Sequence, residues 1–295
     1  MVRVNCYIIQ FLILIVILEF IAVFQLPDRN LHIIACDVGQ GDAILMVYKN
    51  IQILTDGGPD KKVLNCLGKY LPFWDRDIEL VISTHPDADH STGLIAVIKE
   101  YNVAEIFINP IDSGTQTIKA LENAVGSRGL GVVSPVEGDR YRLDLIYLDI
   151  VNPTDQQIGA LNAKVEGSSL NFYKPVEGTN EYSISYKLSF GSFSGLFTGD
   201  FQNDVSDRIS LNSAVGRVNY IKVSHHGSKH GLSENLLKAI EPKVAVISVG
   251  RKNSYGHPHQ EILDMLTKYG AKIYRTDEVG DVDLTTDGKK YWIKN

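Results

Sequence analysis

The stretch that decides the fold of this chain is THPDADH at positions 84–90, which directly follows the apolar run 80–83. Such a run predicts a short buried strand, so the polar stretch is interpreted as the loop after it. It holds four possible metal ligands within six residues: His85, Asp87, Asp89 and His90. Imidazole combined with carboxylate suits Zn²⁺, Mn²⁺ or iron. A helix-capping role for Asp89 is the structural alternative, but it leaves both histidines unexplained.

Other polar groups also follow apolar runs. SHHGS at 224–228 and YGHPH at 255–259 come after predicted strands, and FTGD at 197–200 ends another strand in Gly-Asp. Polar side chains at the ends of several strands are how a layered fold assembles one site. The isolated His32 is expected to be a core or surface residue, and His230 a solvated residue at a helix entry.

Predicted strands and helices alternate after residue 27. Strands are predicted at 31–37, 43–48, 51–55, 80–83, 105–108, near 132, and at 141–150, 182–190, 194–198, 220–224, 244–249 and within 272–294. Helices are predicted at 61–71, 92–101, 117–124, 234–240 and 260–269. This order predicts an α/β (α+β) sandwich of two mixed sheets with helices outside. The segment 152–180 is rich in Gly, Ser, Asn and Pro, and it is predicted to be a long loop and a candidate lid.

The segment 7–26 reads YIIQFLILIVILEFIAVFQL and contains one charge, Glu19. Twenty apolar residues are long enough to cross the hydrocarbon core of a bilayer. Arg3 before the segment and Asp28 after it favour an orientation that places the rest of the chain outside the membrane. We therefore predict a membrane anchor over residues 1–28 and one globular domain over 29–295. A cleaved signal segment, and hence secretion, is the alternative.

The composition excludes some classes of protein. The net charge is −6 and no long run of Lys or Arg occurs, which argues against wrapping of duplex DNA but leaves a local nucleic-acid groove open. The cysteines are Cys6, Cys36 and Cys66, without a C-x-x-C motif. They predict no disulfide framework, and Cys36 is expected to pack as a small hydrophobic residue.

Six segments occur in the order found in one known family. They are CDVGQGDAIL (36–45), LTDGG (54–58), ISTHPDADHSTGL (82–94), LFTGD (196–200), IKVSHHGS (221–228) and ISVGRKNSYGHPH (247–259). Together they resemble the metallo-β-lactamase superfamily, and more closely the extracellular hydrolase domain of ComEC-type competence proteins. The resemblance implies a four-layer αββα sandwich and a hydrolase with one or two divalent ions, Zn²⁺ or Mn²⁺. The channel of those proteins is not recognised here, so a separate membrane channel protein is a candidate partner.

By this resemblance, metal ligands are assigned residue by residue: His85 to a first ion, Asp89, His90 and His225 to a second, and Asp200 to both. Asp56 matches a strand-end Asp that supports the ligands. In the DVGQGD turn, Gly39 and Gly41 allow unusual backbone angles. Asp37 in the same turn is a candidate to approach the site.

Two departures from the family pattern make the predicted ligand set richer in oxygen. Asp87 stands where the superfamily has its second histidine, and no histidine lies between His90 and His225. Asn180 and His257 are candidates to replace the missing ligand. More oxygen ligands shift the preference of a site from Zn²⁺ toward Mn²⁺.

The implied function is a phosphodiesterase or nuclease that acts on single-stranded DNA outside the membrane, through a metal-activated water. Asp89 or Asp200 can accept the proton of that water. His226, Ser228 and His257 are candidates to hold a phosphate, and the two histidines are candidates to protonate the leaving oxygen. Four cations flank these motifs, as a rim for a polyanion or as ordinary solvated charges: Lys222, Lys229, Arg251 and Lys252.

Two other functions fit the same residues. A small neutral substrate, such as a phosphocholine ester, lactone or β-lactam, would suit the acidic charge of the chain. The other is a non-catalytic module that binds DNA or a surface polymer around a structural metal. Structural zinc sites are usually closed by four ligands rich in Cys, and the open Asp/His set differs from that pattern.

Overall fold

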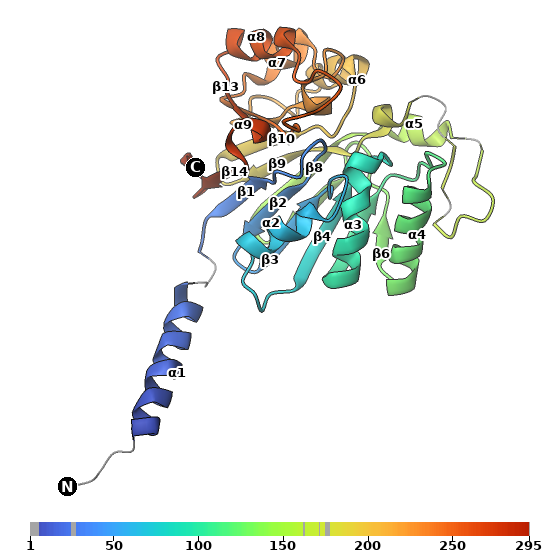
Figure 1. Ribbon diagram of the computed structural model, residues 1–295. Helices are drawn as coiled ribbons and strands as arrows, with labels where there is room; N and C mark the ends of the chain where they lie inside the picture. Colours follow the sequence, from blue (N-terminus) through green and yellow to red (C-terminus); the bar gives the residue numbers. More distant parts are fainter. Residues whose placement is uncertain (1–5, 25–27, 162, 171, 175–177, 295) are drawn as a thin grey trace.

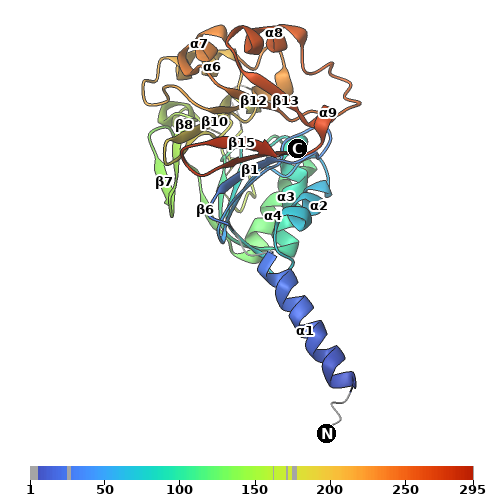
Figure 2. The ribbon, with the colours of Figure 1, turned by 90° about the vertical axis from the view of Figure 1, so that its left-hand side faces the viewer.

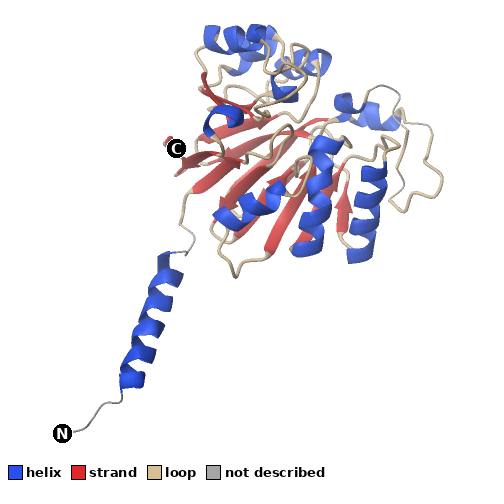
Figure 3. Cartoon of the chain, viewed as in Figure 1, coloured by secondary structure: helices blue, strands red, loops and turns tan. Residues whose placement is uncertain are grey.

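Two β-sheets lie face to face, and helices cover their outer faces (Figure 1, Figure 3). The computed structural model describes residues 6–24, 28–161, 163–170, 172–174 and 178–294. Helix, sheet, sheet and helix form four layers, which confirms the predicted sandwich of two mixed sheets with helices outside.

The first sheet has eight strands in the order β15-β14-β1-β2-β3-β4-β5-β6. They are β1 (Leu31–Ala35), β2 (Ile44–Tyr48), β3 (Ile51–Thr55), β4 (Asp77–Ser83), β5 (Asn102–Ile108), β6 (Gly131–Val133), β14 (Val282–Thr286) and β15 (Tyr291–Lys294). β3 to β6 are parallel to one another, and the remaining pairs are antiparallel. Three helices cover the outer face: α2 (Lys62–Tyr70), α3 (Ala88–Glu100) and α4 (Gln116–Arg128).

The second sheet has seven strands in the order β13-β12-β11-β10-β9-β8-β7. They are β7 (Arg140–Leu143), β8 (Ile146–Asn152), β9 (Ser185–Phe190), β10 (Phe193–Phe197), β11 (Tyr220–Lys222), β12 (Val244–Ile247) and β13 (Lys272–Arg275). Its outer helices are α6 (Asn203–Ser210), α7 (Glu234–Ile240) and α8 (Gln260–Lys268). Shorter pieces are α5 (Asp155–Gly159), α9 (Thr276–Val279) and the 3₁₀ turns η1 (Thr179–Tyr182) and η2 (Ser224–Gly227).

Alternation along the strands divides the hydrophobic core into layers. On β1, Ile33 points into the core between the sheets, while its neighbour Ile34 packs beneath α2 and α3. Successive side chains of a strand point to opposite faces, so a sheet buried on both faces is apolar at every position. This explains why β2 is a continuous apolar run and why β1 is apolar at every position except His32.

Strand register separates the two edges of the first sheet. Ala35, Ile44 and Thr55 are neighbours at one end of the strands, and Leu31 and Tyr48 are neighbours at the other end. We call these two ends of the strands the first edge and the opposite edge of the sheet. The turns that follow β3 and β4 emerge at the first edge, because β3 and β4 are parallel. The THPDADH stretch therefore lies at the edge opposite to the start of β1.

Helix α1 (Cys6–Phe24) projects away from the sheets in both views (Figure 1, Figure 2). Apart from Gln10 and Glu19, its described side chains are apolar, and most are exposed, Phe11 and Leu14 among them. The predicted membrane segment 7–26 continues into residues 25 and 26, which lie outside the described residues. Within the part of the chain that the structure describes, no helix reaches the length and hydrophobicity that crossing a bilayer requires. The predicted membrane helix is therefore not supported.

One prediction about the cysteines was wrong. Cys36, at the end of β1, forms a disulfide with Cys66 on α2, with their Cα atoms 5.9 Å apart. Both residues are buried between the first sheet and its outer helices. The pairing depends on tertiary contact between segments 30 residues apart, which a sparse and odd cysteine count did not indicate.

The described part of the segment 152–180 is largely irregular, as predicted, but it includes helix α5 and contacts with α4. Beyond α5, its described residues pack beside α4: Phe172 is buried, and Glu122 of α4 accepts hydrogen bonds from Ser168 and the backbone N–H of Leu170. At the end of the segment, the Thr179 hydroxyl donates to Asp87 at 2.9 Å. The candidate lid thus reaches the THPDADH stretch at one described contact.

Candidate metal centre

Residues 84–87 of the THPDADH stretch form a loop, as predicted, and residues 88–90 already belong to helix α3. The helix begins at Ala88, four residues before the predicted start, so Asp89 and His90 lie in its first turn. Asp87 occupies the N-cap position with an extended backbone, but its side chain makes no capping hydrogen bond. The partial positive charge of a helix N-terminus favours the carboxylates placed there.

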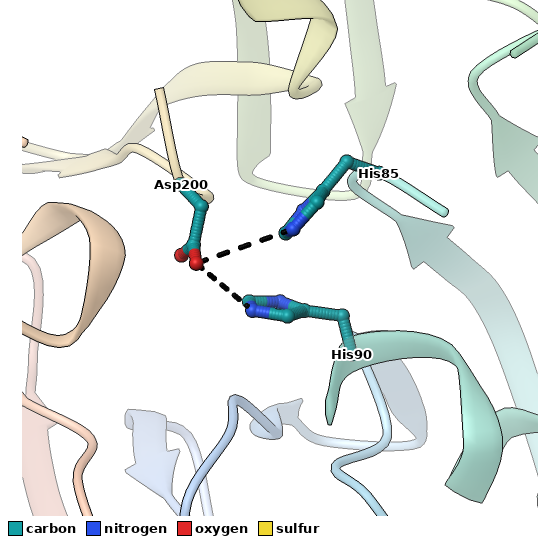
Figure 4. Close-up of side chains that lie close together, drawn as sticks. All are labelled: His85, His90 and Asp200. Atoms are coloured by element: carbon teal, nitrogen blue, oxygen red, sulfur yellow. Dashed lines mark ion pairs between the residues drawn. The ribbon is translucent and has the colours of Figure 1, made fainter. Parts of the chain in front are cut away.

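Three buried side chains from different elements meet at one point (Figure 4). His85 follows β4, His90 lies on α3, and Asp200 follows β10. An oxygen of Asp200 lies 3.3 Å from Nε2 of His90 and 4.0 Å from Nε2 of His85. We call this point the focus.

His226 and Asp89 complete the focus. Nε2 of His226 lies 3.2 Å from an oxygen of Asp89 and 3.4 Å from one of Asp200. The η2 turn carries two consecutive left-handed residues, His225 with φ 49° and His226 with φ 53°. Such backbone is uncommon for residues other than glycine and is often found at functional sites.

The second ring nitrogen of each histidine at the focus is held by the protein. Nδ1 of His85 lies 3.0 Å from the Thr84 hydroxyl. Nδ1 of His90 lies 2.8 Å from a carboxylate oxygen of Asp56, and Nδ1 of His226 lies 2.9 Å from the Ser248 carbonyl. The carbonyl can only accept, so Nδ1 of His226 carries the proton when the ring is neutral. Its Nε2 then presents a lone pair to the focus, which is the arrangement of a metal-binding histidine.

The buried polar atoms at the focus fit a divalent cation. Within the described chain, Nε2 of His85, His90 and His226 and one oxygen of Asp200 are buried without a hydrogen-bond partner. Buried polar atoms normally make hydrogen bonds, so four that make none at one point need an explanation. Ligand atoms of His85, His90 and Asp200, and of Asp89, His90 and His226, lie close enough to share an ion.

The electrostatics of the focus also suit a cation. Burial disfavours the charged His90 ring, but the carboxylates of Asp200, Asp56 and Asp89 outweigh it and raise its pKa well above the usual value. Burial opposes a charge on His226 as well, yet Asp200 and the other nearby carboxylates raise its pKa to about 10. Both pKa shifts indicate a strongly negative electrostatic potential at the focus.

Asp56 supports the focus from the end of β3. It has φ 58°, and its carboxylate accepts hydrogen bonds from the backbone N–H and the hydroxyl of Thr84, at 2.8 and 2.7 Å. The same carboxylate contacts His90. One buried Asp thus holds the residue before His85 and also the ring of His90, a structural role of the kind that the resemblance implied.

The structure places the other predicted ligands around the focus. His225 belongs to none of the candidate ligand groups among the described residues, whereas its neighbour His226 belongs to two. Asp87 is 40% exposed, and its oxygen lies 3.7 Å from Nε2 of His85. Asn180 lies in η1, half-buried, next to the Thr179 that contacts Asp87.

The predicted substrate residue His257 lies near His226, with 6.5 Å between their ring centroids. The His257 ring lies 5.7 Å from that of His225 and 5.0 Å from that of His259, between ring centroids. Nδ1 in all three rings is buried without a hydrogen-bond partner within the described chain. Burial, together with the neighbouring imidazoles, lowers the pKa of His257 to about 4. Ser228 is buried, and its N–H donates to the carbonyl of His225.

Among the remaining polar residues, Lys222 and Asp37 differ from expectation. Lys222 is buried rather than part of a solvated rim, while Lys229, Arg251, Lys252 and His230 are exposed, as a rim or solvated role requires. Asp37 does not turn toward the site: its carboxylate accepts the N–H of Gly39, and its own N–H donates to Asp281.

Sequence reasoning missed Asp42, the partner of Lys222. Their side chains are 2% and 1% exposed and form an ion pair at 2.6 Å. Burial opposes ionisation of Asp42, but Lys222 and then His226 hold its pKa well below the usual value. A lysine inside the apolar run YIKVS was the available signal, because a buried lysine requires an acidic partner.

Comparison with known proteins agrees with this geometry. The family described as the metallo-beta-lactamase superfamily matches residues 36–251. ComE operon protein 3 of Bacillus subtilis is 24% identical over 265 residues, which cover 83% of this chain and 32% of the relative. Recombination protein 2 of Haemophilus influenzae is 25% identical over 284 residues, covering 95% of this chain and 32% of the relative. Both are ComEC-type competence proteins.

The chain spans about a third of the length of these curated relatives. A solved structure, the metallo-beta-lactamase fold protein YhfI from Bacillus subtilis, superposes with a TM-score of 0.53 at 11% identity. The match covers 90% of this chain and 100% of that one. The sandwich, the focus at one edge of it and the family match together lead to one assignment: the chain belongs to the metallo-β-lactamase superfamily.

Proposed function

We propose that this chain is a metal-dependent phosphodiesterase that hydrolyses single-stranded DNA outside the membrane. One observation carries the hydrolytic part: three buried Nε2 atoms converge on the Asp200 carboxylate, and neither these nitrogens nor one of the Asp200 oxygens makes a hydrogen bond within the described residues. The similarity to competence proteins supports DNA as the substrate.

The metal would be held at the focus. His85, His90 and Asp200 would bind one ion, and Asp89, His90 and His226 provide a second set of ligand atoms that shares His90 with the first. When bound, a divalent ion lowers the pKa of a water molecule and neutralises charge on a phosphoryl oxygen. In this proposal His226 replaces His225 as the ligand, because its Nε2 faces Asp89 and Asp200.

Asp89 is the better placed of the two candidate bases. Its side chain is 34% exposed, whereas that of Asp200 is 4% exposed. Asp89 therefore reaches both the focus and solvent, so it can accept a proton from water at the focus and release it to bulk water. Asp200, being buried among imidazoles, serves as a ligand.

Substrate would contact the side of the focus that carries His225, His257 and His259. All three histidines are half-buried, and a ring N–H that faces a bound substrate can donate to a phosphate oxygen. The exposed Lys229, together with Arg251 and Lys252, would attract the following phosphates of a single strand by screened Coulomb forces.

An extracytoplasmic location is part of the proposal. The Cys36–Cys66 disulfide supports it, because disulfides persist in oxidising compartments and are rare in the cytosol. The exposed apolar side chains of α1 support attachment to a membrane, and α1 joins the sheet at the edge opposite to the focus. A separate membrane channel protein would then receive or deliver the strand.

The test compares three substrates with each of two metals. Metal-depleted protein is reloaded with Mn²⁺ or Zn²⁺ and given single-stranded DNA, bis-p-nitrophenyl phosphate and nitrocefin. We expect cleavage of the two phosphodiesters, with Mn²⁺ at least as effective as Zn²⁺, and loss of cleavage in Asp200→Asn but not in the exposed control Asp204→Asn. Rapid nitrocefin turnover beside inert phosphodiesters would reject the proposal.

A further inference from the structure

A buried ion pair lies directly behind His226 and is not part of the ligand set proposed above. Nζ of Lys222, at the end of β11, lies 2.6 Å from one oxygen of Asp42 and donates to the Val223 carbonyl at 2.9 Å. The other oxygen of Asp42 is buried, lacks a hydrogen-bond partner within the described residues, and lies 3.4 Å from Nδ1 of His226. A fully buried pair costs desolvation, so its presence here calls for a function.

The backbone of Asp42 also joins segments that carry the focus. Its N–H donates to the carbonyl of Asp89 at 3.2 Å, and its carbonyl accepts from the N–H of Gly58 at 2.8 Å. The adjacent Gly41 leaves no space for a Cβ against the Asp89 backbone. Asp42 is therefore held on two sides by segments whose positions set Asp89 and Asp56, which gives its side chain one defined direction.

We propose that Asp42 and Lys222 are positioning residues that orient His226 toward a metal at the focus. The Ser248 carbonyl and the Asp42 carboxylate lie on the Nδ1 side of the ring, at 2.9 and 3.4 Å, and so direct Nε2 at Asp89 and Asp200. Lys222 keeps the Asp42 carboxylate in place and balances its charge. Because His226 is a left-handed residue in a short turn, its ring direction depends on such contacts.

Lys222 also keeps Asp42 out of the ligand set. A ligand oxygen of Asp42 lies within reach of the Asp200 and His226 ligand atoms, and it could bind an ion if it were released. Removing the ammonium therefore changes both the direction of His226 and the number of oxygens available to the metal.

This inference rests on the metal centre of the proposed function, and it is tested by metal binding in full-length protein. The variants are Asp42→Asn, Lys222→Met and the double variant Asp42→Asn/Lys222→Met, which leaves no buried charge unpaired and is expected to fold even if a single variant does not. Arg208→Met is the control, because it breaks the half-buried Arg208–Glu137 pair at 2.8 Å, away from the focus. Thermal unfolding confirms folding of each variant.

The readouts are the affinity for Co²⁺, measured by competition with a chelating dye, and the visible absorption spectrum of bound Co²⁺. We expect folded Asp42→Asn and the double variant to lose 10- to 100-fold in affinity, and every folded site variant, Lys222→Met included, to change the spectrum, which loss of stability alone would not do. A double variant with parental affinity and spectrum would overturn the inference, and so would an equal loss in Arg208→Met. If the parent protein itself binds no metal, the proposed function fails first.

Discussion

Asp56 holds His90 through a hydrogen bond of 2.8 Å between a carboxylate oxygen and Nδ1, while two further hydrogen bonds tie the same carboxylate to Thr84. All three groups are buried. The carboxylate therefore links the end of β4 to the first turn of α3 independently of any metal.

We expect Asp56→Asn to lower the free energy of unfolding of metal-free protein by about 1.5–3 kcal/mol, because the amide nitrogen cannot accept from these donors. Denaturant unfolding in the presence of a chelator measures this. Asp264→Asn, at an exposed position of α8, should change little. Equal stability of the Asp56 variant and the parent would show that the buried carboxylate contributes nothing to the fold.

Replacing the two adjacent histidines of η2 in turn distinguishes their roles. His226→Ala should remove metal from the protein, since its Nε2 faces two carboxylates, whereas His225→Ala should retain metal and lose turnover. Elemental analysis after dialysis, with activity measured on the same samples, separates the two outcomes. The reverse pattern would restore His225 as the ligand that the family resemblance implied.

The disulfide is expected to contribute about 2–4 kcal/mol to stability, because it closes a segment of 30 residues in the unfolded chain. Cys36→Ala/Cys66→Ala should lower the free energy of unfolding by that amount, and Cys6→Ser should not. Thiol titration of unfolded, unreduced protein should find one free thiol per chain, and a count of three would refute the pairing.

Two helical glycines form a matched pair. A Cβ on Gly93 of α3 would collide with the carbonyl oxygen of Gly57, while a Cβ on Gly68 of α2 meets no atom within 4 Å. Gly68→Ala should therefore stabilise the protein by about 0.5–1 kcal/mol through helix propensity. Gly93→Ala should destabilise it despite the same propensity gain, because α3 must move away from β3. Thermal or denaturant unfolding that ranks the two variants in the opposite order would show that the close approach is not required.

His32 predicts a pH dependence of stability away from the focus. Burial disfavours its charged form, and Lys294 adds to this, but Asp283 and Asp28 outweigh both and raise its pKa. Because the folded value is raised, the stabilisation is complete below the unfolded value of about 6.5 and is lost as the pH rises through the folded value. His32→Gln should thus cost up to about 1 kcal/mol at pH 5.5 and less at pH 8.5. A cost independent of pH would mean that packing, not charge, accounts for it.

The sandwich and most of the focus could be predicted from the sequence, because they depend on local pattern. Apolar runs ending in polar groups identified the strand ends, and parallel strands then bring those ends to one edge. The positions of His85, His90 and Asp200 followed from that alone. The predicted start of α3, residue 92, lies four residues after the observed start at Ala88, because the ligands Asp89 and His90 belong to the first turn of the helix.

The features that could not be predicted depend on the backbone conformation of single residues or on single tertiary contacts. Two consecutive left-handed residues decide that His226 rather than His225 faces the carboxylates, and no pattern of residue types encodes this. The pairing of Lys222 with Asp42 joins residues 180 positions apart, one at the end of β11 and the other in the turn before β2, so neither one indicates the other.

The Cys36–Cys66 bond has a consequence for the chemistry as well as for stability. The bond closes a covalent ring that contains both Asp42 and Asp56. The carboxylates of these two residues contact Nδ1 of His226 and Nδ1 of His90, respectively. The ligand residues themselves lie outside the ring. Reduction of this one bond would therefore remove the covalent constraint from both supporting carboxylates at once, leaving them held only by their noncovalent contacts, while every ligand residue stays outside the affected segment.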